Sequence, residues 1–460
     1  MKEEIKAWKQ KARTRGTFLR NLIFTFSSNA IIYGINLLFY PLITYLFSPA
    51  SYAEFAIWNL LVNNLIIIGA LGYTDSLVIA KSQKEYFLLS SAIACLMIIL
   101  TFFLMVLFLI LQKSFWSTFD SNPFDWIFLA FPVALMINAR SILYTGNIRL
   151  NLLERSAKVN TYLKLISKMV VIILGWLGAS NGLGLVAGDI VFSFLILFFI
   201  LPTDQISRYW RSLKKIEISR YLQVLKTNLD YPRYVFPTLW VVILIQQLPV
   251  WIVGFQFSTD QLGLYSFCLG ILSIPVSMFT NSIRPVFFKK NIEFKSLTDL
   301  ERRTKVSKLI KWMVFALPLY NIFGFLGIDL FYDYLFAEKW EGGEELMKTM
   351  IIGIGGILLG SPMASIFKVN NNLRVDLIVR LLSLLTMCLG CYLLVIFGVD
   401  FLRFSLAFNC MYFLSFLILF VFQLREFDYK TREILKVLSQ VGLAMSTSVI
   451  GILGIIWLFD

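Results

Sequence analysis

The chain has 460 residues, of which 58% are hydrophobic and 15% are charged. Soluble domains carry about a quarter charged residues, so this composition excludes a soluble globular protein. Lys and Arg outnumber Asp and Glu by 14, and apolar runs of about 20 residues, the length of one helical membrane span, recur throughout. The sequence predicts an all-α polytopic membrane protein.

Thirteen apolar runs are predicted to span the membrane. They lie near residues 21–46, 53–79, 87–111, 125–147, 162–180, 183–202, 231–256, 263–287, 310–336, 345–367, 375–398, 402–424 and 437–459. The first run follows a basic tail, residues 1–20, and is longer than the apolar core of a signal peptide. No small-residue cleavage site follows this run, so we expect the first span to be retained.

The distribution of Lys and Arg predicts the orientation. With the N-terminus in the cytoplasm, the tail and the inner connections with their flanking residues hold 37 of the 42 Lys and Arg residues. The outer connections hold only Lys113, Lys339, Lys348 and Arg403. This asymmetry follows the positive-inside rule and predicts a cytoplasmic N-terminus. Contact with anionic lipids then explains the positive charge, and no nucleic-acid partner is expected.

Short motifs recur at a fixed distance along the chain. The septet KVNTYLK from Lys158 is followed 210 residues later by KVNNNLR from Lys368. The same distance separates FSPASYAEF, which starts at Phe47, from FSTDQLGLY, which starts at Phe257. Both septets fall in the predicted cytoplasmic connection between the fourth and fifth spans of their half, which indicates an internal repeat.

The repeat predicts how the chain is divided. Six spans fall in each half, so the halves have the same orientation and form a parallel repeat with a cavity between two lobes. We expect the lobes at residues 21–202 and 231–424, with a basic cytoplasmic linker at 203–230. A basic loop and the thirteenth span, at 425–460, lie outside the repeat.

Polar side chains recur at helical spacing on several predicted spans. They are Asn29, Tyr33, Asn36 and Tyr40 on the first, Ser273, Ser277 and Thr280 on the eighth, Asn59 and Asn63 on the second, and Gln246 on the seventh. Hydroxyl and amide groups bind sugars, but they also hold membrane helices together. Either interpretation fits a single residue, whereas the stripes taken together favour a polar cavity.

Cationic side chains also fall within predicted spans. Arg140 and Arg284 lie inside the fourth and eighth spans, and Arg233 opens the seventh. Such cations are costly unless they face a cavity, form a pair or reach back to the interface. We favour a cavity for Arg140 and Arg284 and leave both interpretations open for Arg233. A guanidinium group is suited to bidentate binding of a diphosphate.

Few acidic side chains are embedded in the spans, chiefly Asp75 and Asp189. The chain has no histidine, so proton coupling through a side chain would require one of these two. No cofactor or metal is expected, because Cys388 and Cys391 lie in an apolar span without a histidine partner. The spacing of Gly356 and Gly360 is typical of close helix packing.

Several stretches resemble a known family. They include PLITYLFSPASYAEFAIWNLLVNNLIIIGALGYTDSLVIA, LGLYSFCLGILSIPVSMFTNSIRPVFFKKN, FAEKWEGGEELMKTMIIG and KVNNNLRVDLIVRLLSLL. In pattern and order, residues from about 18 to 424 resemble the Wzx-type polysaccharide flippases of the MATE-like MOP exporter superfamily. The resemblance implies a transporter that moves undecaprenyl-diphosphate-linked oligosaccharide, the precursor of O-antigen, lipopolysaccharide or capsule, across the bacterial inner membrane. It also implies polysaccharide polymerase and chain-length proteins as partners.

Two other functions fit the sequence less well than a flippase does. A MATE-like exporter of cationic drugs would favour acids in its cavity, whereas the embedded charges here are mainly basic. A membrane glycosyltransferase or polymerase would need catalytic carboxylates or bases in a large loop, but the longest outer loop, residues 112–125, is short. The sequence therefore favours a flippase that works by alternating access of its two lobes and performs no covalent chemistry.

Overall fold

The computed structural model describes residues 30–80, 82–118, 125–149, 153–200, 218–294, 299–370 and 372–459. All regular secondary structure in these ranges is helical. Within them, eleven helical segments are long and apolar enough to cross a membrane, and a shorter apolar helix occupies Ala30–Leu46. The prediction of an all-α polytopic membrane protein is therefore confirmed.

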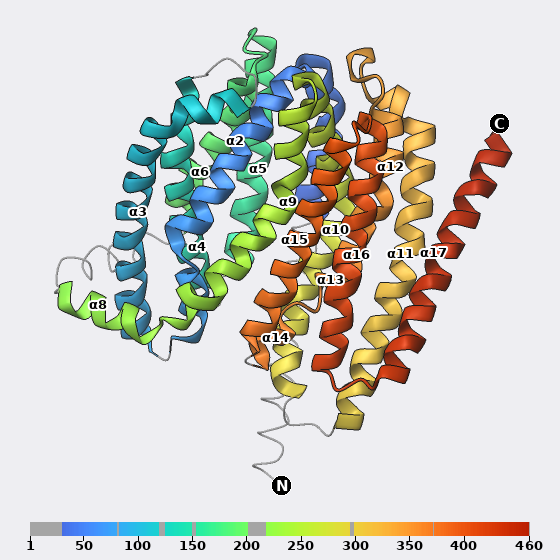
Figure 1. Cartoon of the computed structure of the whole chain (residues 1–460). Coiled ribbons are helices and arrows are strands. Elements are labelled where there is room, and N and C mark those ends of the chain that lie inside the picture. The colour runs from blue at the N-terminus through green and yellow to red at the C-terminus, as the bar shows by residue number, and fades with distance from the viewer. Residues whose placement is uncertain are drawn as a thin grey trace.

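The helices form two groups, which lie side by side in Figure 1. The N-terminal bundle contains Ala30–Leu46, α2 (Pro49–Ala70), α3 (Gln83–Thr118), α4 (Ala130–Arg149), α5 (Leu153–Trp176) and α6 (Gly182–Phe199). The C-terminal bundle contains α9 (Phe236–Gln256), α10 (Thr259–Phe294), α11 (Asp299–Leu335), α12 (Gly343–Gly355), α13 (Ile357–Gly360), α14 (Ile366–Val369), α15 (Leu373–Ile396), α16 (Phe401–Glu426) and α17 (Thr431–Phe459). Helix α8 (Ile218–Thr227) precedes α9 in the connection between the bundles. The twofold relation between the predicted lobes stays a prediction.

The two ends of the molecule differ in charge. Helices α9, α11, α15 and α17 begin at the lower end in Figure 1. Helix α8, the α14–α15 connection and the α16–α17 connection, which carry Lys and Arg residues, lie at this end, which we call the basic end. Helix α17 runs from the basic end to the opposite end, as Figure 1 shows, and so follows the path predicted for a thirteenth span.

The path of α17 predicts the location of the C-terminus. We expect alkaline phosphatase fused after Asp460 to be active, because it would lie outside the cytoplasm. A green fluorescent protein inserted at Tyr429, between α16 and α17, should fluoresce because it stays inside. Fluorescence from fusions at both positions would show that α17 does not cross the membrane.

The second predicted span differs from its helix. Helix α2 begins at Pro49, where the Ser48 hydroxyl accepts a hydrogen bond from Ser51 N at 3.3 Å. It ends at Ala70 because Leu71 and Gly72 adopt positive φ angles of 45° and 73°. The predicted stretch 53–79 therefore ends in a 3₁₀ helix, η1 (Tyr73–Ile79), that lies at the basic end.

The tenth predicted span, 345–367, is broken into α12, α13 and α14. Pro362 lacks an N–H group, and Ala364 N donates to Ser361 O instead of to the Gly360 carbonyl four residues back. The Gly360 carbonyl accepts a hydrogen bond from the buried Gln423 Nε2 of α16, at 2.7 Å. A side chain of another helix thus replaces the main-chain donor that the break removes.

Glycines let the broken span pack closely on α16. A Cβ atom at Gly353 would lie 2.5 Å from the Asn409 carbonyl oxygen. A Cβ atom at Gly356 or Gly360 would lie about as close as 3 Å to α16 atoms, which is tighter than ordinary contact. The predicted role of Gly356 and Gly360 in close helix packing is confirmed.

Helices α2 and α10 form the centre of the molecule and join the two bundles. Neither carries an exposed large hydrophobic side chain among its described residues, unlike α3, α5, α15 and α17. At the opposite end the two backbones touch, since a Cβ atom at Gly263 would lie 1.7 Å from the Pro49 carbonyl oxygen. Position 263 therefore accepts only glycine in this arrangement.

Aromatic side chains seal the same end of the bundle boundary. The ring centroids of Phe267 and Trp340 are 4.2 Å apart, and those of Tyr52 and Trp340 are 5.2 Å apart. The indole Nε1 of Trp340 donates to the Thr44 carbonyl at 3.0 Å, and Trp340 and Phe267 are fully buried. The two bundles are therefore closed against each other at the opposite end.

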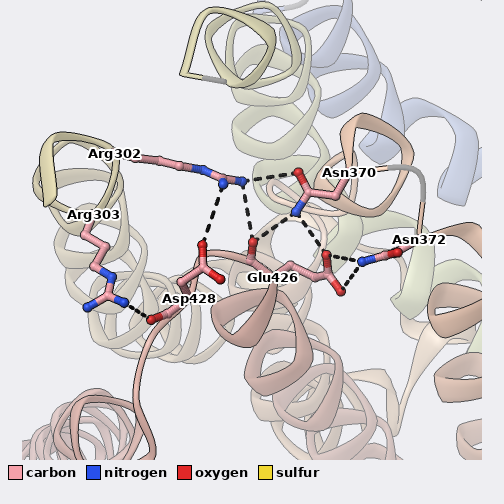
Figure 2. Close-up of polar contacts among 6 residues, drawn as sticks. All are labelled: Arg302, Arg303, Asn370, Asn372, Glu426 and Asp428. Atoms are coloured by element: carbon pink, nitrogen blue, oxygen red, sulfur yellow. Dashed lines mark hydrogen bonds and ion pairs between the residues drawn. The ribbon is translucent and has the colours of Figure 1, made fainter. Parts of the chain in front are cut away.

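The second septet, residues 368–374, anchors the connection between α14 and α15. Figure 2 shows Asn370 and Asn372 donating to the Glu426 carboxylate at the end of α16, at 2.9–3.0 Å. Arg302 of α11 donates to Asn370 Oδ1 at 3.2 Å and lies 3.8 Å from an Asp428 carboxylate oxygen. These contacts tie α11, α15 and the α16–α17 connection together at the basic end.

Candidate functional site

Four charged side chains meet in the N-terminal bundle: Arg140 of α4, Lys164 and Lys168 of α5, and Asp189 of α6. We call them the charge cluster. Lys164 Nζ lies 3.1 Å from Asp189 Oδ1, and Lys168, one helical turn later, interacts electrostatically with both charges. The Phe192 ring lies against two of the cations, with its centroid 4.8 Å from the Arg140 guanidinium carbon and 5.2 Å from Lys164 Nζ.

The cluster lies at mid-depth of the bundle. Lys164 and Lys168 follow the start of α5 at Leu153 by 11 and 15 residues. At 1.5 Å per residue these positions are about 17 and 22 Å along the helix axis. Arg140 and Asp189 likewise fall in the middle third of α4 and α6. Both lysines were predicted to flank an inner connection, which is wrong because α5 already begins at Leu153.

The helical faces show that the cluster points into the protein. The exposed apolar side chains of α5 are Tyr162, Ile166, Met169, Ile173 and Trp176. At about 100° per residue, Lys164 and Lys168 lie on the other side of the helix from this stripe. Asp189 is about 180° from the exposed Phe198 on α6. Lys164 and Asp189 nevertheless keep 20% and 31% of their side-chain surface accessible, so the pair is not fully sealed inside the bundle.

Tyr40 of the first helix connects the charge cluster to the bundle boundary. Lys168 Nζ lies 5.9 Å from the centroid of its ring, and the ring meets Phe267 of α10 edge-on at 5.6 Å. Tyr33, two turns earlier on the same helix, accepts a hydrogen bond from Asn281 Nδ2 of α10 at 2.9 Å. The structure thus places these two residues of the predicted polar stripe against α10.

The other asparagines of the predicted stripes have different surroundings. Asn29 lies outside the described residues. The Oδ1 atom of Asn36 is buried and has no hydrogen-bond partner among the described residues. Asn59 donates to the Phe55 carbonyl of its own helix at 3.0 Å, and Asn63 is half-buried on α2. Their predicted role in sugar binding stays a prediction.

On α10 the hydroxyl groups bond to their own helix, whereas the arginine does not. Ser273 donates to the Leu269 carbonyl, Thr280 donates to the Val276 carbonyl at 2.9 Å, and Ser277 is half-buried. Arg284 is exposed and donates to the Ser361 hydroxyl at the break between α13 and α14. Arg284 is therefore the residue of this stripe that a ligand can reach most easily.

The remaining predicted residues of the C-terminal bundle are spread out. Gln246 lines a small pocket between α9, α15 and α16 together with Arg380, whose Nε lies 2.7 Å from Asp376 Oδ1. Arg233 is exposed just before α9, with its guanidinium 5.4 Å from the Tyr234 ring centroid. Neither is in contact with the charge cluster, which is confined to the N-terminal bundle.

The two repeated septets supply different contacts. Residues 158–164 lie within α5, where Asn160 accepts a hydrogen bond from Arg140 Nη2 at 3.4 Å and Lys164 pairs with Asp189. Residues 368–374 instead anchor the α14–α15 connection. One copy therefore contributes to the charge cluster, and the other contributes to the basic-end anchor.

Asn63 and Gln246 were predicted as polar site residues, but their neighbours Asn64 and Gln247 form the polar contact across the bundle boundary. Asn64, next to the predicted Asn63, donates to Gln247 Oε1 at 2.6 Å and accepts from Trp240 Nε1 at 3.0 Å. Gln247 likewise neighbours the predicted Gln246. One residue is a rotation of about 100° on a helix, and the residue type alone does not fix that rotation.

Asp75, predicted as a coupling acid, forms an ion pair across the boundary, and its coupling role stays a prediction. At the basic end, Asp75 of η1 pairs with Lys368 of α14, and both side chains remain about 40% accessible. Exposed pairs contribute roughly 0–1 kcal/mol, so this contact adds little to the contact between the bundles at the basic end.

Charge reversal tests the ion pair. Asp75→Lys places two cations together and is expected to lower the midpoint of thermal unfolding slightly, because the pair contributes at most about 1 kcal/mol. The exchange Asp75→Lys/Lys368→Asp should return the midpoint to that of the unmodified protein, measured in the same detergent. If the effect of the double variant equals the sum of the effects of Asp75→Lys and Lys368→Asp alone, the two residues do not pair directly.

The comparisons with known proteins agree with this architecture. The model of a family described as polysaccharide biosynthesis protein matches residues 42–343, more than half of the chain. The chain belongs to this family. No curated protein matches it closely enough to count as a relative.

Solved structures place this polysaccharide biosynthesis protein in a fold group. Lipid II flippase MurJ, in an inward closed conformation, superposes with a TM-score of 0.63 at 16% identity, covering 94% of this chain and 98% of MurJ. An inward-facing multidrug MATE transporter of the MOP superfamily gives 0.54 at 12% identity, covering 88% and 98%. The eukaryotic MATE transporter AtDTX14 gives 0.55 at 11% identity, covering 95% and 99%.

Family and fold together confirm the resemblance drawn from the sequence. The likeness to the solved structures concerns the fold, and the family match concerns polysaccharide biosynthesis. The chain is thus a multi-pass membrane protein of the polysaccharide biosynthesis family, with the fold that MurJ and the MATE transporters share. Within this polysaccharide biosynthesis protein, the charge cluster brings four embedded charges together, whereas Arg284 is a single embedded cation on α10.

Proposed function

We propose that the chain flips undecaprenyl-diphosphate-linked oligosaccharide from the cytoplasmic to the outer leaflet of a bacterial plasma membrane. The observation that carries this proposal is the charge cluster, which places three cations and one carboxylate at mid-depth of an apolar bundle. Its net charge of about +2 matches the two negative charges of a diphosphate esterified at both ends. The family match and the fold shared with MurJ support the same function.

The proposed mechanism replaces the hydration of the headgroup. A diphosphate that enters hydrocarbon loses its water, which is prohibitive unless cations and hydrogen-bond donors take its place. The headgroup enters from the basic end, which the positive-inside rule assigns to the cytoplasm. The charge cluster binds the diphosphate, the sugars meet polar groups at the bundle boundary, and the polyprenyl tail stays in lipid. The sealed aromatic contacts at the opposite end then open, and the basic end closes.

The net positive charge of the cluster argues against an exporter of cations. Three cations at mid-depth would repel a cationic drug, whereas an exporter of such drugs needs a surplus of acids. A polymerase would require catalytic groups in a loop, and the charge cluster is held by three helices instead. The polymerase and chain-length proteins are proposed as partners of the flippase.

Flipping in reconstituted vesicles tests the function. Vesicles loaded with fluorescent undecaprenyl-diphosphate oligosaccharide should expose it to an impermeant quencher when the protein is present. Lys168→Gln should lower the rate about tenfold or more, because a charge-assisted contact is lost. Lys436→Gln, which removes an exposed lysine at the start of α17, serves as the matched control and should flip normally. Transport of a lipophilic cation without flipping of the lipid would favour the drug exporter.

A further inference from the structure

Asp189 is the carboxylate of the charge cluster. Lys164 Nζ lies 3.1 Å from its Oδ1 atom, and the charges of Lys168 and Arg140 act on it as well. If a proton neutralised Asp189, three cations would remain in the bundle without an anion, which is costly in a medium of low polarity. The predicted role of Asp189 as a proton carrier is therefore less favourable than a role as a counter-ion.

The two lysines of the cluster differ in their partners. Lys164 is paired with Asp189, whereas Lys168 has no ion-pair partner among the residues that the structure describes. Lys168 lies beside Tyr40, which reaches the bundle boundary. A ligand arriving from the boundary thus meets an unpaired ammonium group first and a paired one afterwards.

We propose that Asp189 is a displaceable counter-ion of an anion site. A diphosphate binds first at Lys168 and Arg140, and its second phosphate then takes Lys164 from the carboxylate. The diphosphate nature of the ligand rests on the proposed function, whereas the exchange itself follows from the geometry of the cluster. Asp189 holds Lys164 neutralised while the site is empty and competes with the ligand while the site is filled.

This competition has a consequence for turnover. A site of three unopposed cations would bind a diphosphate tightly and release it slowly. Because Asp189 can return to Lys164, it weakens binding and aids release once the headgroup has crossed the membrane. Asp189 is thus a positioning residue that acts on the ligand through Lys164, and its effect should differ for binding and for turnover.

Binding of inorganic pyrophosphate to the purified full-length protein tests the exchange without a lipid. Asp189→Asn keeps the shape of the side chain and removes its charge, so pyrophosphate should bind about tenfold more tightly than to the unmodified protein. Lys164→Gln should bind about tenfold more weakly, because a cation is lost and the carboxylate is left to repel the ligand.

Glu344→Gln is the matched control, since it removes one carboxylate from Lys348 at the opposite end while Asp329 remains 2.7 Å from that lysine. Its pyrophosphate affinity should be unchanged. Equal or weaker binding by a folded Asp189→Asn protein would overturn the proposal. If Asp189→Asn does not fold, unchanged binding by Lys164→Gln would overturn it equally, because a purely structural pair predicts that result.

Vesicle flipping separates this inference from the proposed function. In Asp189→Asn, the concentration of undecaprenyl-diphosphate oligosaccharide that gives half the maximal flipping rate should fall, and the maximal rate should fall as well. If pyrophosphate affinities follow the expected order but no variant or unmodified protein flips the lipid, the site binds free diphosphate and the proposed function fails alone. If flipping proceeds and Asp189→Asn leaves both pyrophosphate affinity and half-saturation unchanged, the counter-ion role fails alone.

Discussion

Arg140→Ala should abolish or strongly reduce surface polysaccharide while the protein remains in the membrane at its normal abundance. The substitution removes from the charge cluster the guanidinium that lies over the Phe192 ring and donates to Asn160. Loss of a charge-assisted contact to a phosphate is worth about 1.5–3 kcal/mol, or roughly ten- to a hundred-fold in affinity. Arg140→Lys should restore only part of the activity, because an ammonium group cannot form the planar, bidentate contact.

Arg284 offers a second cation for the same test, and Arg403 offers a control. Arg284→Ala, in the C-terminal bundle, is expected to act in the same direction, since Arg284 is exposed on a central helix beside Ser361. Arg403→Ala removes a highly exposed arginine at the opposite end and should leave surface polysaccharide unchanged. Normal export by Arg140→Ala and Arg140→Lys at matched abundance would show that this arginine only reaches back to the interface.

Gly263→Ala should destabilise the whole protein. The added Cβ atom would lie 1.7 Å from the Pro49 carbonyl oxygen, so α2 and α10 must separate at the opposite end. Overpacking of a core costs about 1–3 kcal/mol, and here the obstacle is a backbone atom that no side-chain rotation removes. We expect a fall in the midpoint of thermal unfolding in detergent, measured by tryptophan fluorescence, and a lower yield.

Gly442→Ala is the matched control for this effect. A Cβ atom at Gly442, on α17, would have nothing within 4 Å. Alanine favours a helix over glycine by roughly 1 kcal/mol, so this variant should be as stable as the unmodified protein or slightly more stable. Equal unfolding midpoints for the two variants would mean that α2 and α10 are not in contact at Gly263.

Eleven of the thirteen predicted spans are single helical segments long and apolar enough to cross a membrane among the described residues, in the predicted order, because a span requires a length of apolar chain that is easily recognised. Of the other two, the first is described only as the shorter helix Ala30–Leu46, and the tenth is broken. The sequence did not predict helix ends that depend on single residues. Examples are the turn at Leu71 and Gly72 after α2, and the break around Pro362. In both cases the apolar composition continues through the break, so composition alone cannot reveal it.

The candidate site was predicted less completely for a similar reason. The fifth span was placed at 162–180, so Lys164 and Lys168 looked like residues of a basic connection. Helix α5 begins nine residues earlier, at Leu153, and carries them to mid-depth. Their spacing of four residues, within the limits of a predicted span, was the available signal. The pairing of Asp189 with Lys164 depends on how α5 and α6 pack, which no local pattern encodes.

The bond between Gln423 and the Gly360 carbonyl has a consequence for related sequences. The break in the tenth span leaves a carbonyl that its own helix no longer satisfies, and Gln423 of α16 is the donor that replaces it. A homologue whose helix continues through position 362 does not need the side-chain amide at position 423. A homologue with the break does need it. Among homologous chains, we expect residues 362 and 423 to change together, so that co-variation between them marks which homologues share the broken span.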